Sequence, residues 1–191
     1  MTSLTLTLGP VVQLTREQFH ELCKVNHDIR LERSSTGDLI LMPPTGWESG
    51  KRNADLTTNL NLWNRQAQLG IVFDSSTGFS LPNGADRSLD VAWVEKARIE
   101  TLAPDPANFL PLAPDFVIEL RSATDKLATL QHKLAEYRDC GVRLGWLIDP
   151  QEKRVEIYRV DRPTEYLSQP EQLSGEEVLP GFMLVMAEIW G

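Results

Sequence analysis

The chain has 191 residues, with 27 acidic and 19 basic side chains and a formal net charge of −8. This length suits one domain with a sizeable core, and the acidic balance argues against a basic protein that coats nucleic acid, although it is compatible with an enzyme that acts on nucleic acid. No apolar run approaches the roughly 20 residues of a membrane span, no stretch resembles a signal peptide, and the distant Cys23 and Cys140 lack metal-ligand spacing, so we expect a cytoplasmic protein without disulfides.

The first half of the chain is expected to form two helices and several short strands. Thr15 and Gln18 have the spacing of a capping box, which predicts a helix over residues 15–26. Apolar residues at helical spacing predict a longer helix over residues 46–69, with Gly70 as its C-cap. Extended segments are expected at 28–33, 38–42, 71–75, 78–81 and 89–95.

The second half contains the clearest alternation of strand and helix. A buried strand is expected over residues 115–121, a helix over 124–140 with Thr124 as its cap, and two further strands over 142–148 and 154–160. Residues 103–114 contain four prolines and are expected to form a loop. The last 29 residues hold five acidic and no basic side chains, and their hydrophobic residues (Phe182, Met183, Leu184, Val185, Ile189 and Trp190) are expected to pack either on the core or on a partner.

Together these elements predict a mixed α/β (α+β) fold in which helices flank a central mixed sheet and a crossover helix joins two of its strands. No repeat and no low-complexity linker interrupts the pattern. We therefore expect a single domain that spans residues 1–191.

Charged residues in the predicted strand at 115–121 are the first candidates for a functional site. Alternation places Glu119 and Arg121 on one face of a strand that is otherwise apolar. A buried charge is costly unless it is paired or bound to a metal. The pattern therefore leaves two explanations open, an ion pair at the end of the strand or a functional site.

Two further acids have similar alternatives. Asp90 begins an apolar strand, where it is either a turn residue or a site residue at a strand end. Glu48 lies in the first turns of the long helix, where an acid also stabilises the helix dipole. If these acids converge with Glu119, they form a set of hard oxygen ligands suited to Mg²⁺, and a neighbouring cation can stabilise charge on a phosphate.

Several motifs extend this interpretation. Residues 90–94 read DVAWV, residues 113–122 read APDFVIELRS, residues 133–137 read KLAEY and residues 141–150 read GVRLGWLIDP, while 43–53 read PPTGWESGKRN. Over roughly residues 10 to 190 the sequence resembles the putative restriction endonuclease family that is abundant in cyanobacteria and belongs to the PD-(D/E)XK nuclease superfamily. The resemblance is most specific between residues 114 and 150, and it implies a restriction-endonuclease-like core.

The resemblance also implies roles for individual residues. Asp90 matches the first motif acid, Glu119 the second, and Glu48 the acid that many members carry on the first core helix. Asp115 is a decoy despite its preceding proline, because it lies on the same strand as Glu119. Lys133 and Tyr137 resemble the Gln-x-x-x-Tyr helix motif of some members, with lysine in place of glutamine.

Two departures from the motif concern its proline and its lysine. Leu89 replaces the proline, which shapes only the entrance to the strand. Arg121 occupies the position of the motif lysine, and a guanidinium binds phosphate well but does not act as a base at neutral pH. Lys133 is the residue that could supply the missing amine from the helix.

The leading hypothesis is a nuclease that hydrolyses DNA with Mg²⁺, or Mn²⁺ as its substitute. Asp90, Glu119, the carbonyl of Leu120 and Glu48 would hold the metal, while Arg121 and Lys133 would orient the water and neutralise the phosphate. The resemblance also suggests a homodimer. The alternatives are a nuclease-like fold retained as a DNA-binding or protein-interaction module without turnover, and a globular protein whose acids only support its strands and helix caps.

Overall fold

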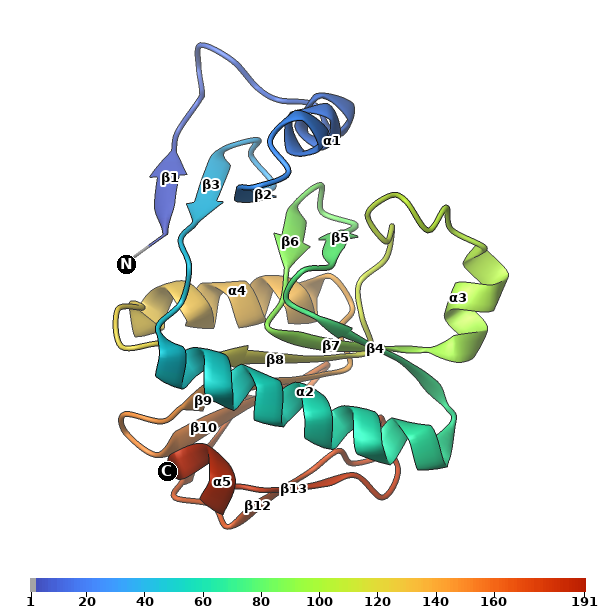
Figure 1. Cartoon of the computed structure of the whole chain (residues 1–191), viewed down its shortest axis with the longest axis vertical. Coiled ribbons are helices and arrows are strands. Elements are labelled where there is room, and N and C mark those ends of the chain that lie inside the picture. Colours follow the sequence, from blue (N-terminus) through green and yellow to red (C-terminus); the bar gives the residue numbers. More distant parts are fainter. Residues whose placement is uncertain (1–2) are drawn as a thin grey trace.

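The computed structural model describes residues 3–191. The fold is built around one large mixed sheet (Figure 1). The sheet has the strand order β11-β10-β9-β8-β7-β4. Its strands, in that order, are Glu165–Ser168, Arg154–Arg159, Leu144–Asp149, Phe116–Leu120, Val91–Glu95 and Gly70–Asp74. Only β8 and β9 run parallel within it, and helix α4 (Leu127–Asp139) makes the crossover between them, as a parallel pair requires.

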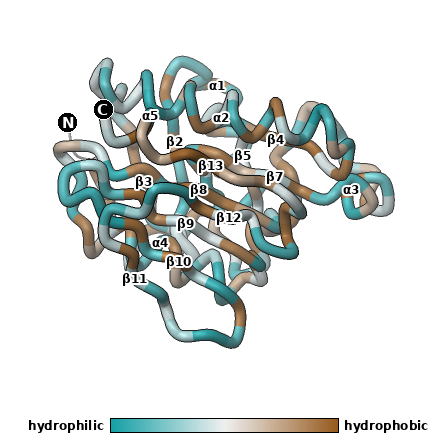
Figure 2. The backbone as a smooth tube through the Cα atoms, turned by 90° about the horizontal axis from the view of Figure 1, so that it is seen from below, coloured by the Kyte–Doolittle hydropathy of each residue, from teal (hydrophilic) through white to brown (hydrophobic). Residues whose placement is uncertain are grey.

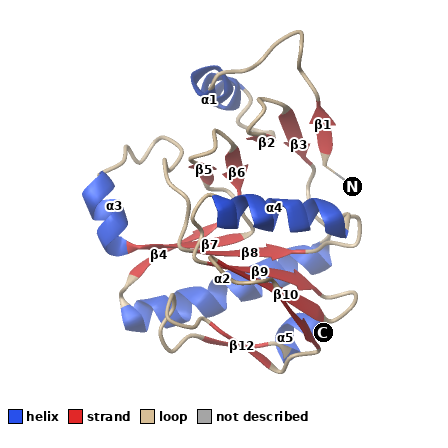
Figure 3. Cartoon of the chain, turned by 180° about the vertical axis from the view of Figure 1, so that it is seen from behind, coloured by secondary structure: helices blue, strands red, loops and turns tan. Residues whose placement is uncertain are grey.

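Two helices cover the opposite faces of this sheet. Views from opposite sides show α2 (Trp47–Ala67) on one face and α4 on the other (Figures 1 and 3). Alternation along β8 sends Phe116, Ile118 and Leu120 into the core that α2 shares, and Val117 into the core under α4. The hydropathy-coloured tube shows hydrophobic strand segments in the middle and mostly hydrophilic turns at the periphery (Figure 2).

A smaller antiparallel sheet is formed by strands from the N-terminal half of the chain. Its strand order is β1-β3-β2-β6-β5, formed by Leu4–Leu6, Leu39–Met42, Arg30–Arg33, Asp86–Ser88 and Gly78–Ser80. Helix α1 (Arg16–Val25) adjoins it, and the expected capping box of Thr15 and Gln18 is present. The sheet connects directly to the large one, because β6 leads into β7 after two residues.

The C-terminal segment packs on the large sheet. It contains a two-stranded sheet of β12 (Gln172–Ser174) and β13 (Met183–Val185), followed by helix α5 (Ala187–Trp190). Phe182, Leu184 and Ile189 are buried in the core beside α2, whereas Met183 and Val185 are about half exposed. Most of these C-terminal hydrophobic residues therefore pack on the core, one of the two arrangements expected from the sequence.

The mixed α/β (α+β) fold expected from the sequence is confirmed, with several local corrections. The cap of α2 is Gln68, which adopts the left-handed conformation, whereas Gly70 begins β4. Helix α4 begins after Lys126, so Thr124 precedes the helix and does not cap it. Strands β1 and β6 and helix α3 (Lys96–Leu102) lie in segments for which no element was predicted. Among residues 3–191, no helix is long and apolar enough to span a membrane.

Candidate active site

The register of β7 and β8 brings Asp90 and Glu119 together. Val91 pairs with Ile118 in these antiparallel strands, and the same register places Asp90 opposite Glu119. Opposite residues of such a pair point to the same face of the sheet. The Asp90 carboxylate accepts hydrogen bonds from the backbone N–H of Leu120 at 2.8 Å and from Asn53 Nδ2 at 3.3 Å. Residues far apart in sequence thus hold this acid at the end of two central strands.

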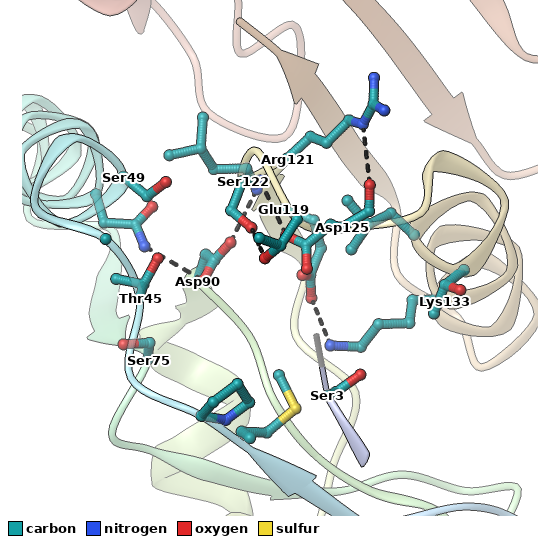
Figure 4. A pocket seen from close by; sticks show the side chains of 18 of the residues that line it. Ser3, Thr45, Ser49, Ser75, Asp90, Glu119, Arg121, Ser122, Asp125 and Lys133 are labelled. Carbon is teal, nitrogen blue, oxygen red and sulfur yellow. Dashed lines mark hydrogen bonds and ion pairs between the residues drawn. The ribbon is translucent and has the colours of Figure 1, made fainter. Parts of the chain in front are cut away.

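Helix α4 supplies two side chains to Glu119, which is only 3% exposed. The Tyr137 hydroxyl donates to Glu119 Oε1 at 2.8 Å, and Lys133 Nζ lies 3.4 Å from the same oxygen. Lys133 and Tyr137 are one turn apart and therefore lie on the same face of the helix. The structure thus places the amine of Lys133 beside the second acid (Figure 4).

The neighbours of Lys133 include an acid that sequence reasoning missed. Lys133 Nζ donates to Glu32 Oε1 at 3.2 Å, across 101 positions of sequence. Glu32 belongs to β2 and is 1% exposed. In the sequence Glu32 is only a charged residue within a short strand pattern. The smaller sheet was therefore not expected to contribute to the site.

The two opposed carboxyls have raised pKa values. Burial raises the pKa of Glu119 to about 7, with further contributions from Asp90 and Glu32, while Lys133 and the Tyr137 hydrogen bond act in the opposite direction. Burial also raises the pKa of Asp90, against the hydrogen bond from Leu120. Burial acts to lower the pKa of Lys133, but Glu119 and Glu32 together outweigh it, so its pKa lies above the ordinary lysine value and the amine stays protonated. Because the charge of Asp90 adds to the rise in the Glu119 pKa, a further cation beside these two carboxyls would favour their ionised forms.

Oxygen atoms around Asp90 and Glu119 fit a divalent cation of the Mg²⁺ type. Asn53 Oδ1 is buried without a hydrogen-bond partner and belongs to the same side chain that donates to Asp90. Mg²⁺ is held through one or two carboxylates and keeps several waters, so two acids suffice. Within residues 3–191, no group of three or more His, Cys, Asp or Glu side chains has the arrangement of a metal site.

Two other sequence candidates are directed elsewhere. Glu48 is exposed and pairs with Arg52 at 2.9 Å on its own helix. The guanidinium of Arg121 pairs with Asp149 at 2.7 Å and points away from Asp90 and Glu119 (Figure 4). Both side chains border the same cavity as the two acids, but the structure records no contact between either of them and Asp90 or Glu119 among the described residues.

Asp115 has a structural role at the opposite end of β8. It accepts a hydrogen bond from the backbone of Glu95 at 2.8 Å and pairs with Arg98 at 2.9 Å. It does not line the cavity that contains Asp90 and Glu119. Its separation from Glu119 agrees with its interpretation as a decoy.

A cavity of about 1000 Å³ gives access to the two acids. Its walls come from strands β2, β3 and β6, the turn after β4, the start of α2, the ends of β7 and β8, and α4 with the segment before it. Hydroxyl side chains from these walls surround the acids, among them Thr45, Ser49, Ser75 and Ser122 (Figure 4). Trp47 lies on the same rim and is 83% exposed. This cavity is large enough for part of an extended, polar substrate.

Comparisons with known proteins agree with this architecture. A family model described as a putative restriction endonuclease matches residues 16–187. The chain is similar in structure to a putative nuclease of the DUF820 family from Anabaena variabilis ATCC 29413, with a TM-score of 0.80, 19% sequence identity and coverage of 93% of this chain and 97% of that one. At this identity the similarity shows the fold. Among curated proteins, none matches the sequence.

Proposed function

The chain belongs to the Uma2 family, described as putative restriction endonucleases, and from this premise we propose that it is a Mg²⁺-dependent nuclease that hydrolyses DNA phosphodiester bonds. The observation that carries the proposal is the buried pair Asp90 and Glu119 with the amine of Lys133 3.4 Å from Glu119. Two acids and an amine are the groups that a PD-(D/E)XK-like site requires.

We propose that Asp90, Glu119 and the carbonyl of Leu120 hold the metal. A bound Mg²⁺ supplies Lewis acidity, which activates water and offsets negative charge on the phosphate. The pairing of Glu48 with Arg52 gives no support to Glu48 as a ligand. The orphaned Asn53 Oδ1 supports an additional oxygen ligand, either directly or through water.

The roles of the surrounding side chains follow from their contacts. Lys133 is the proposed replacement for the motif lysine, and its ammonium orients the nucleophilic water and stabilises charge on the scissile phosphate. Tyr137 fixes the orientation of Glu119 through its 2.8 Å hydrogen bond. Arg121 is engaged with Asp149, so we propose that it supports the end of β8 and does not take part in catalysis.

The proposed enzyme is a homodimer in the cytoplasm. Two active sites allow both strands of a duplex to be cut within one encounter. Cys23 and Cys140 are free thiols, which suits a reducing compartment. Analytical ultracentrifugation is expected to show a dimer, and a monomer at all concentrations would contradict that part of the proposal.

Calorimetry provides the first test. We expect the wild-type protein to bind Mg²⁺ or Mn²⁺ and the isosteric variants Asp90→Asn and Glu119→Gln to lose this binding, because each removes a charged oxygen ligand. Glu48→Gln and Asp115→Asn are matched controls that should bind like the wild type. Equal binding by the wild type and both site variants would exclude the assigned ligands.

A cleavage assay separates the nuclease from the alternative module. We expect the wild type to cut plasmid or linear DNA in the presence of Mn²⁺ and Lys133→Met to lose most of this activity. RNA and single-stranded DNA serve as competing substrates in the same assay. Measurable DNA affinity without cleavage of any of these substrates would favour a binding module.

A further inference from the structure

We propose that Glu32, on the smaller sheet, is a positioning residue that holds Lys133 at the active site, an inference that rests on the function proposed above. Glu32 Oε1 lies 3.2 Å from Lys133 Nζ, slightly closer than the 3.4 Å between Lys133 and Glu119. The smaller sheet is thereby part of the active site and does more than cover it.

The carboxylate of Glu32 is fixed by groups other than Lys133. Its Oε1 also accepts a hydrogen bond from the backbone N–H of Ser88 at 3.3 Å, and its Oε2 accepts one from Arg87 at 3.1 Å. Arg87 is in turn held by Glu136 of α4 at 2.8 Å. Because two donors of β6 hold this buried carboxylate and Glu136 of α4 holds one of them, Arg87, the position of the carboxylate does not depend on Lys133 alone.

Lys133 needs such an anchor because of its flexible stem and its shared partner. A lysine ammonium sits on four rotatable carbons, so one partner restrains it weakly. Its other partner is Glu119, which the proposed function commits to a metal ion. Glu32 then remains as the carboxylate that keeps the ammonium beside the reacting phosphate. The two acids have different tasks, since Glu119 belongs to the ligand set and Glu32 does not contact Asp90 or Glu119 in any recorded hydrogen bond or ion pair of residues 3–191.

The test compares Glu32→Gln with the matched control Glu136→Gln. Both variants remove a carboxylate that pairs with Arg87, but only the first removes a partner of Lys133. In single-turnover cleavage with Mn²⁺, we expect Glu32→Gln to slow the chemical step by about a hundredfold, as misplacement of a reacting group does, with DNA affinity unchanged. Glu136→Gln should cleave within a few-fold of the wild type. Equal rate losses in the two variants would overturn the proposal.

A second readout does not depend on activity. Lys133 is acylated with limiting acetic anhydride, and the modified peptide is quantified by mass spectrometry in folded protein. We expect protection of Lys133 in the wild type and in Glu136→Gln, and several-fold faster labelling in Glu32→Gln. Unchanged protection in Glu32→Gln would show that Glu32 does not hold Lys133.

Two further controls keep the test decisive. Thermal unfolding verifies that each variant is folded, and Glu32→Asp replaces Glu32→Gln if the latter is not, because it retains the charge but shortens the reach to Lys133. The Asp variant is expected to show the same faster labelling in weaker form, and full protection would contradict the proposal. If the wild type cleaves no DNA, the proposed function fails, while the labelling still decides whether Glu32 holds Lys133.

Discussion

Glu119 couples the stability of the fold to pH. Burial raises its pKa to about 7, above its ordinary value near 4.5, so between these values the folded state binds more protons than the unfolded state. The associated stability is fully present below about pH 4.5 and is lost as the pH rises through about 7. A shift of this size corresponds to about 3 kcal/mol.

Urea unfolding with a chelator present measures this coupling. We expect wild-type stability to fall relative to Glu119→Gln between pH 4.5 and pH 8, because only the wild type must ionise a buried carboxyl. Added Mg²⁺ should reverse part of the loss in the wild type alone. A constant difference between the two proteins across this pH range would be inconsistent with a raised Glu119 pKa.

Arg121 provides a second prediction, which distinguishes structural support from catalysis. Its partner Asp149 is 1% exposed, so removal of the guanidinium leaves a buried carboxylate with fewer donors. We expect Arg121→Gln to lower the free energy of unfolding by about 2 kcal/mol, with metal affinity unchanged. Calorimetry and urea unfolding measure both quantities. A large loss of cleavage without a loss of stability would instead support the catalytic role implied by the resemblance.

Sequence reasoning identified the central acids because their environment is encoded locally. Strand alternation and the apolar residues around Asp90 and Glu119 mark two central strands with a charge at the end of each. The partner of Arg121 could not be identified in this way, because Asp149 reaches it through the parallel pairing of β8 with β9. Glu32 reaches Lys133 only after the smaller sheet has folded against α4, so no local pattern indicates the contact.

At the scale of elements, helix interiors and the capped start of α1 were predictable, whereas the end of α2 and the start of α4 were not. Amphipathic spacing located α2, α4 and α1, whereas the end of α2 depends on its surroundings. Gly70 resembled a helix cap but is required for another reason, because a β-carbon there would collide with the Trp93 indole and the Val94 carbonyl. Strands β1 and β6 have three residues each, and such short strands depend on their neighbours in the sheet.

The end of α2 gives a pair of opposite predictions. Gln68 has a φ of 54°, so Gln68→Gly relieves left-handed strain in the folded state. Glycine also makes the unfolded chain more flexible, which offsets part of this gain. The net expectation is a rise of about 0.5 kcal/mol in the free energy of unfolding. Gly70→Ala should lower it by about 2 kcal/mol through overpacking against Trp93. Denaturant unfolding at one pH measures both changes. Stabilisation by Gly70→Ala would show that the contact with Trp93 is not tight.

For the whole molecule, the net charge of −8 does not describe the field at the cavity. Five of the acids lie in the C-terminal 29 residues. Two of them, Glu165 and Glu176, pair with Arg159 of β10. The cavity is lined by equal numbers of basic residues (Arg30, Arg52, Arg87, Arg121, Lys126 and Lys133) and acidic residues (Glu32, Glu48, Asp90, Glu119, Asp125 and Glu136). Its lining is formally neutral, so one divalent cation makes it favourable for a polyanion. The acidic total therefore does not oppose the proposed substrate.

The two sheets are proposed to form one cooperative domain over residues 1–191. A single apolar cluster contains Phe79 of the smaller sheet and Leu81 and Ala85 of its β5–β6 turn, together with Leu134 and Tyr137 of α4. Ion pairs of α4 with Glu32 and Arg87 reinforce this junction. Separation of the sheets would expose the cluster and leave these charges unpaired, so partial unfolding is unfavourable.

Calorimetry is therefore expected to show one transition, with an unfolding enthalpy of about 130 kcal/mol near 60 °C for a chain of this length. None of the five tryptophans lies in α1 or in a strand of the smaller sheet, so their fluorescence reports on the large sheet and the elements packed on it. Far-ultraviolet circular dichroism reports on the secondary structure of both sheets and all helices. The two signals should change at the same temperature, and the van't Hoff and calorimetric enthalpies should agree. An early loss of circular dichroism at constant fluorescence would mean that the smaller sheet unfolds first. In that case Glu32 would leave Lys133 before the large sheet melts, and protection of Lys133 from acylation should disappear in the same early step.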